Sequence, residues 1–351
     1  ENIYLWSGCL GANDSVLLHD DALLPHWQEF ANALQLYQNH EAPNQLYIYN
    51  MQLTSSVINL LTPALKGRPI KGFSLGNNEF VDAREGVDFA IEIIQSNEKL
   101  KVFGLVNNSI DSMEDANHLV EAIISHPTID KITLVNCLGG NVDAYNILCS
   151  LLSSTKDFES ICLRSNNIRT RGSTELPGIL ATNPPLCRLF LEKNHLDDND
   201  AVTIARALKQ NTNLRRLHLG QNDITETGRV ALRNTIYDST SLNAVADSNH
   251  TCTILGIDLE GITLDNRDDL SKVNRGRKIY SLLSSRNREG ANVQHLDSEF
   301  EDDSLKLVPK VLESVHGYSG YSSHPTGDVR PLSIMYEVLR SWKMPTLYET
   351  T

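Results

Sequence analysis

A spaced pattern of apolar residues followed by a polar turn recurs along most of the chain. The stretch LRRLHLGQNDI, residues 214–224, places Leu214, Leu217 and Leu219 before Asn222 and Ile224. The alternation around Leu217 and Leu219 predicts a short strand, and the polar residues after it predict a turn. Four stretches further upstream repeat the arrangement, with their asparagines at Asn78, Asn108, Asn166 and Asn194.

The step between these asparagine positions is nearly constant. Weaker copies of the pattern carry other residues there: Asp21, Met51, Cys137 and His250. The positions are 21, 51, 78, 108, 137, 166, 194, 222 and 250, so each step is 27 to 30 residues. Self-similarity at a fixed period of this length predicts about nine copies of one structural unit.

The second half of each unit has the periodicity of a helix. After Asn194, one helix face would hold Ala201, Ile204, Ala205 and Leu208. After Asn222, it would hold Val230, Leu232 and Ile236. One such unit cannot bury its leucines alone, so each unit is expected to cover the apolar face of the next. The asparagine suits the turn because its side chain can bond backbone groups left unpaired there. We expect this asparagine ladder to be imperfect at Met51, Cys137 and His250.

The unit resembles the long repeat of ribonuclease-inhibitor-like (RNI-like) leucine-rich repeat proteins, and the resemblance covers residues 13–256. It implies an α/β fold, a solenoid or horseshoe with parallel strands on the concave face and helices on the convex face. Residues 1–12 are expected to form an N-terminal cap segment, in which Trp6 covers the first unit or contacts another molecule. Residues 257–351, where the period fails, are expected to form a helical C-terminal cap or extension.

The expected C-terminal extension reads as three helices. The first begins near Asp268 and has these apolar positions: Leu270, Val273, Ile279, Leu282 and Leu283. It is also the most basic part of the chain, between Lys272 and Arg288, and an acidic run over residues 297–303 follows it. Two shorter helices are expected at residues 304–315 and 331–342. These segments resemble the endings of repeat proteins from algae and other protists, a resemblance that implies no particular activity.

Charge and composition narrow the range of partners. The 351 residues carry a formal net charge of −13, which argues against general nucleic-acid binding because that requires excess Lys and Arg. No run of about 18 apolar residues exists, so no membrane span is expected.

The six cysteines form no Cys-x-x-Cys pair, which favours buried thiols in a reducing compartment. We expect an intracellular, most simply cytoplasmic, protein. An organelle stays open, because the chain begins at Glu1 and a targeting segment could have been removed.

No arrangement of residues predicts catalysis. The segment LGGN, residues 138–141, lacks the lysine and hydroxyl of a phosphate-binding loop, and no metalloprotease motif or nucleophile elbow is present. His118 and His126 lie eight residues apart on one expected helix, which is poor spacing for a metal. Acidic pairs such as Asp197 and Asp198 fall at helix starts, where carboxylates act as caps. We expect no enzyme activity, no cofactor and no metal.

The strand positions between the inward leucines are the expected binding surface. They are small in the middle, as at Ser74, Gly76 and Gly104, and the pattern extends them to Ala246 and Ser248. The expected contact residues are aromatic or charged: Tyr47, Tyr49, Arg164, Arg188, Phe190, Glu192, Arg216 and His218. Aromatic residues and Arg carry much of the energy of protein interfaces. The equally weighted alternative is that these are solvated sheet residues.

These features predict a non-enzymatic protein–protein interaction scaffold, or a structural subunit of a larger assembly, that binds another protein mainly through the concave sheet. The alternative is a regulator of a small GTPase or an enzyme inhibitor. GTPase-activating proteins of the nuclear transport GTPase are built from similar repeats, but the chain lacks their long acidic tail. A ligase or signalling receptor would need a further domain, and a small-ligand sensor would need a deeper pocket than an open sheet offers.

Overall fold

A parallel sheet runs through most of the molecule. The computed structural model describes residues 2–6, 16–36, 45–257, 266, 270–290, 292–318 and 331–341. Within them the sheet has nine strands: β1 (Asn2–Trp6), β2 (Gln45–Tyr49), β4 (Gly72–Gly76), β6 (Val102–Val106), β7 (Lys131–Val135), β8 (Ser160–Cys162), β9 (Arg188–Phe190), β10 (Arg216–His218) and β11 (Thr253–Leu255). Two short strands, β3 (Gln52–Leu53) and β5 (Glu79–Phe80), form a second sheet. Strand order in the main sheet follows chain order, so each strand pairs with its neighbours in sequence.

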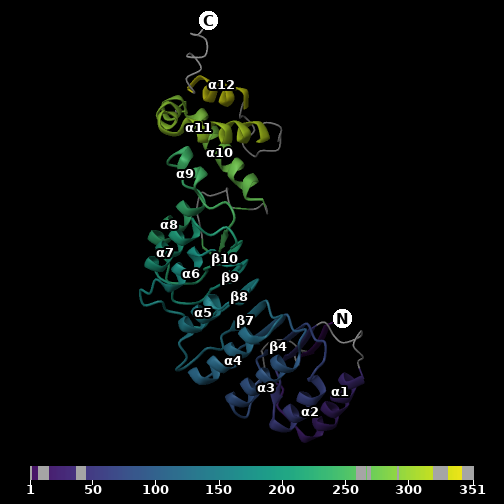
Figure 1. Cartoon of the computed structure of the whole chain (residues 1–351). Coiled ribbons are helices and arrows are strands. Elements are labelled where there is room, and N and C mark those ends of the chain that lie inside the picture. The colour runs from purple at the N-terminus through teal and green to yellow at the C-terminus, as the bar shows by residue number, and fades with distance from the viewer. Residues whose placement is uncertain are drawn as a thin grey trace.

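Helices lie between successive strands and after the last one. They are the 3-10 turn η1 (Asp21–Leu23) and the helices α1 (Leu24–Leu36), α2 (Ser55–Leu65), α3 (Ala83–Ser96), α4 (Met113–Ser125), α5 (Ala144–Ser153), α6 (Glu175–Ala181), α7 (Asp198–Leu208), α8 (Glu226–Ile236), α9 (Leu242–Ala246), α10 (Ser271–Arg288), α11 (Asn292–Tyr318) and α12 (Pro331–Ser341). Figure 1 shows the strands along the inner side of a curved array and α1 to α8 along its outer side. The predicted α/β class with a parallel sheet is confirmed. We call the side of the main sheet that faces away from these helices the open face.

The core lies between the sheet and the helices. In β2 and β7 the second and fourth residues are buried and the other three are half-buried, as expected when successive side chains point to opposite faces. On α7 the predicted face is buried: Ala201, Ile204, Ala205 and Leu208. On α8, Leu232 and Ile236 are buried, but Val230 is 39% exposed and the prediction for it is wrong. The strands from β2 to β10 begin at residues 45, 72, 102, 131, 160, 188 and 216, so these units keep a step of 27 to 30 residues.

Buried asparagines join neighbouring turns, as predicted. The Asn194 Oδ1 accepts from the backbone N–H of Asn166 at 2.9 Å and of Ile168 at 3.0 Å. Its Nδ2 donates to the carbonyls of Leu163 and Leu191, both at 3.0 Å. From Met51 to Asn222, the turn residue just before the asparagine position adopts positive φ, and in four of these turns it is itself an asparagine: Asn50, Asn77, Asn107 and Asn136. These hydrogen bonds therefore hold the turn at the end of each strand against the turn of the neighbouring unit.

The first strand lies at Asn2–Trp6 and not in the weak copy of the pattern that was expected to place Asp21 at the asparagine position. β1 pairs with β2 along its whole length, from Asn2 opposite Gln45 to Trp6 opposite Tyr49. Leu17 forms an isolated bridge with Met51 instead. Met51 holds the asparagine position of the next unit, and the residue aligned with it is therefore Leu17 and not Asp21. The predicted cap segment thus contributes the edge strand of the sheet, while residues 7–12 and the Trp6 side chain lie outside the described residues.

The last unit also departs from the pattern. The last copy of the pattern, which has His250 at the asparagine position, would put a strand just before it; Leu242 and Val245 there lie instead in the helix α9, and the ninth strand is β11, which begins at residue 253. Short apolar spacing fits one turn of a buried helix as well as a strand. Ala246, the last residue of α9, and Ser248, just after it, were expected on the binding surface but are buried. His250 does not replace the asparagine: its Nε2 donates to the carbonyl of Ala246 at 3.1 Å.

The C-terminal helices have a hydrophobic cluster of their own, which α9 shares. On α10, Ile279, Leu282 and Leu283 are buried as predicted, whereas Leu270 and Val273 are exposed. α11 is longer than predicted and includes the acidic run. Figure 1 shows these helices stacked at one end of the array.

Two of the basic residues of α10 are interior and structural. The Lys278 side chain is fully buried, and its Nζ donates to the carbonyls of Ile236 (2.6 Å) and Asn249 (3.0 Å) and to Asn266 Oδ1 (2.6 Å). Arg286 forms a buried bidentate pair with Glu299 of α11, at 3.0 and 3.1 Å. Lys278 therefore joins α10 to the last unit, and Arg286 joins α10 to α11.

Candidate functional site

Stacked tyrosines mark the N-terminal end of the open face. Tyr4 of β1 is opposite Tyr47 of β2 in the strand register, and their rings stack with centroids 4.6 Å apart and an angle of 2° between the ring planes. The Tyr49 ring is tilted beside Tyr47 at 6.2 Å. Burial, and secondarily the neighbouring tyrosines, raises the pKa of Tyr47. The predicted Tyr47 and Tyr49 thus lie together, and Tyr4 joins them.

Tyr49 fills part of the small-residue stretch that was predicted to admit a partner. A Cβ added at Gly76 would lie 2.0 Å from the Tyr49 ring, and the Tyr49 and Ser74 hydroxyls share a hydrogen bond of 2.9 Å. Ser74 and Gly76 are therefore buried on the open face, while Phe73 and Leu75 of the same strand are buried in the core. The glycine therefore makes room for the chain's own tyrosine. The open space lies beside it, in a hollow of about 410 Å³ lined by Tyr4, Leu5, Tyr47 and Tyr49.

Charged residues gather on the open face from β7 to β10. Lys131, Arg188 and Arg216 occupy one row of the strand register. Glu159, just before β8, accepts from Lys131 Nζ at 2.9 Å and also pairs with Arg188. The hydrogen bond from Lys131, together with both nearby positive charges, lowers the pKa of Glu159. Arg188 is therefore held in place by Glu159, whereas Arg216 is exposed.

An aromatic and acidic group lies two residues further along these strands. Phe190 is opposite His218 in the register, and their ring centroids are 6.3 Å apart. The His218 Nδ1 lies 3.5 Å from Glu192 Oε1. The Glu192 side chain is only 14% exposed, and its Oε2 is buried without a hydrogen-bond partner. The structure thus brings together Phe190, Glu192 and His218 as neighbours, with exposed Arg164 at their edge.

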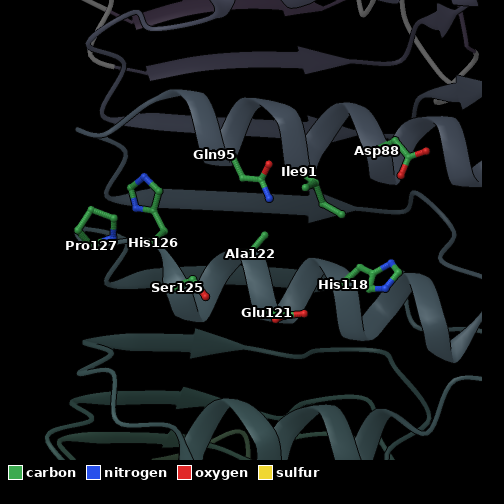
Figure 2. A pocket seen from close by; sticks show the side chains of 9 residues that line it. All are labelled: Asp88, Ile91, Gln95, His118, Glu121, Ala122, Ser125, His126 and Pro127. Carbon is green, nitrogen blue, oxygen red and sulfur yellow. The ribbon is translucent and has the colours of Figure 1, made fainter.

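A second hollow lies on the helix side, between α3 and α4. It has a volume of about 640 Å³ and is lined by Asp88, Ile91, Gln95, His118, Glu121, Ala122, Ser125, His126 and Pro127. Figure 2 shows His118 and His126 at opposite ends of it. Because the two imidazoles are so far apart, they cannot share one ion. In the described part of the chain, no three His, Cys, Asp or Glu side chains are grouped to hold a metal.

His126 has a structural role. The ring is buried, and its Nε2 donates to the carbonyl of Asn97 at 2.9 Å. Its Nδ1 accepts from the backbone N–H of Thr128 and of Ile129, both at 3.3 Å. Desolvation by burial lowers the pKa of His126. The neutral imidazole therefore joins the end of α4 to the preceding unit.

The cysteines for which the structure gives a placement are free thiols: Cys137, Cys149, Cys162, Cys187 and Cys252. Burial raises the pKa of Cys149 to about 11 and that of Cys252 to about 12. The thiols of Cys149 and Cys252 are therefore protonated at neutral pH and are poor nucleophiles. Cys9 lies outside the described residues.

Comparison with known proteins adds no relative. No protein-family model and no curated protein matches the chain. Among the described helices, none has the length and apolar character needed to cross a membrane.

The sequence pattern missed Tyr4 and the ion pairs of Glu159. Tyr4 lies in the segment expected to form a cap, although NIYLW alternates as a strand does. Glu159 immediately precedes β8, and its contact with Lys131 and Arg188 depends on the pairing of three strands.

Proposed function

We propose that the chain is an RNI-like leucine-rich repeat solenoid and acts as a non-enzymatic protein-binding scaffold or as a structural subunit of a larger assembly. A partner protein would lie along the open face. The main support is that aromatic and charged side chains on the open face stay half-exposed. They lie in the row of the strand register that contains Phe190 and His218. Rigid aromatic and Arg side chains presented on a sheet are suited to anchor a protein surface.

The proposal is tested by purifying the tagged chain from native extract. We expect a partner in stoichiometric amount, and we expect Tyr47→Ala or Phe190→Ala to reduce its recovery. Arg206→Ala is the control, because Arg206 is exposed on the outer helix α7. Recovery of the chain as a monomer at near-native concentration, or equal recovery of the partner with all variants, would contradict the proposal.

A further inference from the structure

The open face carries a local positive charge on an acidic protein. The chain has a net charge of −13, yet four cations lie on the open face between β7 and β10: Lys131, Arg164, Arg188 and Arg216. We call these four residues, together with Phe190 and His218, the basic patch. Two carboxylates, Glu159 and Glu192, lie among them, so the lysine, arginine and glutamate side chains of this region leave an excess of two positive charges.

One of those two carboxylates is paired within the patch, and the other is mostly buried. Glu159 pairs with both Lys131 and Arg188, and Glu192 is mostly buried against His218. Arg164 and Arg216 differ, because both are exposed. Neither has an ion-pair partner within 4.0 Å among the residues whose positions the structure gives. Their guanidinium groups are therefore free to bind a carboxylate, which arginine does bidentately.

The two free arginines lie on a diagonal with an aromatic ring halfway between them. Arg164 follows Cys162 by two residues and so shares its face, and Cys162, Phe190 and His218 are aligned across three strands. The ladder continues past β8, because the Leu163 N–H donates to the Phe190 carbonyl. Arg216 lies one strand beyond Phe190 and two residues earlier in the register.

The length of this diagonal matches a short extended peptide. Two strand spacings across and four residues along a strand give roughly 16 Å from Arg164 to Arg216, or about five residues of extended chain. We propose that the basic patch binds an acidic polypeptide segment in which carboxylates flank an aromatic or large aliphatic residue. The carboxylates pair with Arg164 and Arg216, and the apolar side chain packs on Phe190. This proposal rests on the proposed function and names the chemistry of its partner.

A polypeptide fits the patch better than a nucleic acid. Outside the patch the molecule is strongly negative and repels a long polyanion, whereas a short acidic segment meets only the patch. The half-buried Phe190 also provides an apolar contact at the centre, and anchors of this kind carry much of the energy of protein interfaces.

The test measures fluorescence anisotropy with the full chain and a labelled synthetic peptide that has a Glu pair on each side of a central Phe. We expect saturable binding that weakens with salt. Arg164→Glu/Arg216→Glu should weaken it by roughly a hundredfold, since two close charge pairs are reversed. Phe190→Ala should weaken it by roughly tenfold. The matched control is Arg206→Glu/Lys209→Glu on the outer side, which should bind as the wild type does.

Three results would overturn the inference: no binding by the wild-type chain at low salt, equal loss in the two charge-reversed variants, or tighter binding of an RNA probe of similar charge. Circular dichroism and melting temperature establish that each variant is folded. If the peptide does not bind while Tyr47→Ala still reduces recovery of the native partner, this inference is wrong and the proposed function stands. If the chain copurifies with no partner but binds the peptide through Arg164 and Arg216, the proposed function fails instead.

Discussion

Replacing Asn194 by alanine tests the ladder that holds successive units together. The substitution removes the oxygen that accepts two backbone N–H groups, those of Asn166 and Ile168. Asn194 is only 3% exposed, so water is poorly placed to replace it. A buried donor left without a partner costs about 1–3 kcal/mol, so the two donors together should cost ~2–6 kcal/mol. That is a large part of the ~5–15 kcal/mol that stabilises a typical folded domain.

Asn222→Ala is the matched control. Asn222 occupies the same place one unit later, but its side chain is half-buried and its oxygen accepts from a single N–H, that of Leu196 at 3.1 Å. We expect a loss of ~1–2 kcal/mol, because water can approach the freed group. Both variants are compared with the wild type by urea unfolding, followed by far-UV circular dichroism.

Amide hydrogen exchange adds the local measurement, because long repeat arrays need not unfold in one step. In Asn194→Ala the amides of Asn166 and Ile168 should lose protection before those of distant units. The reasoning is refuted if Asn194→Ala costs no more than Asn222→Ala, or if the two amides keep their wild-type protection.

Three further predictions concern other parts of the molecule. Burial lowers the pKa of His250 to about 3 from its usual 6.5. The contribution of His250 to stability is therefore complete above about pH 6.5. Between pH 6.5 and about pH 3 this contribution falls by about 1.4 kcal/mol for each unit of pH decrease. Urea unfolding at several pH values should show that slope reduced in His250→Asn, and an unchanged slope would contradict it. Arg286→Met or Glu299→Gln alone should cost ~3–5 kcal/mol in chemical unfolding, and the double variant Arg286→Met/Glu299→Leu should cost less. A double variant as unstable as the sum of the two singles would argue against this. Gly76→Ala should lower stability by ~1–3 kcal/mol through overpacking against a tyrosine ring, whereas Gly178→Ala, which meets open space in α6, should raise it by ~0.5–1 kcal/mol. Thermal melts of the two variants decide, and equal shifts would count against the packing described.

The central units could be predicted because each position of the pattern has a defined structural role. Leu189 and Leu191 must be buried, and Asn194 must bond the turn of the preceding unit, so the sequence shows all three requirements at fixed spacing. At the ends this redundancy is lost. Leu242 and Val245 have the apolar spacing without an asparagine, and the same spacing fits the helix α9.

The candidate site was predictable in part, for the same reason. Once the strands were assigned, alternation alone indicated the side on which Tyr47 and Phe190 lie. Contacts between units were not predictable in this way. The Tyr49 ring over Gly76 depends on rotamers, and the burial of Lys278 depends on acceptors from segments far apart in sequence.

Site-specific photo-crosslinking tests the central claim most directly, since it identifies which face the partner contacts. A photoreactive residue is placed at position 190 on the open face, at position 47 near the tyrosines, or at position 206 on the outer helix α7, and each chain is irradiated in native extract. The account predicts one crosslinked protein shared by positions 190 and 47, and none at position 206. Crosslinks from position 206 alone, or from none of the three, would contradict it.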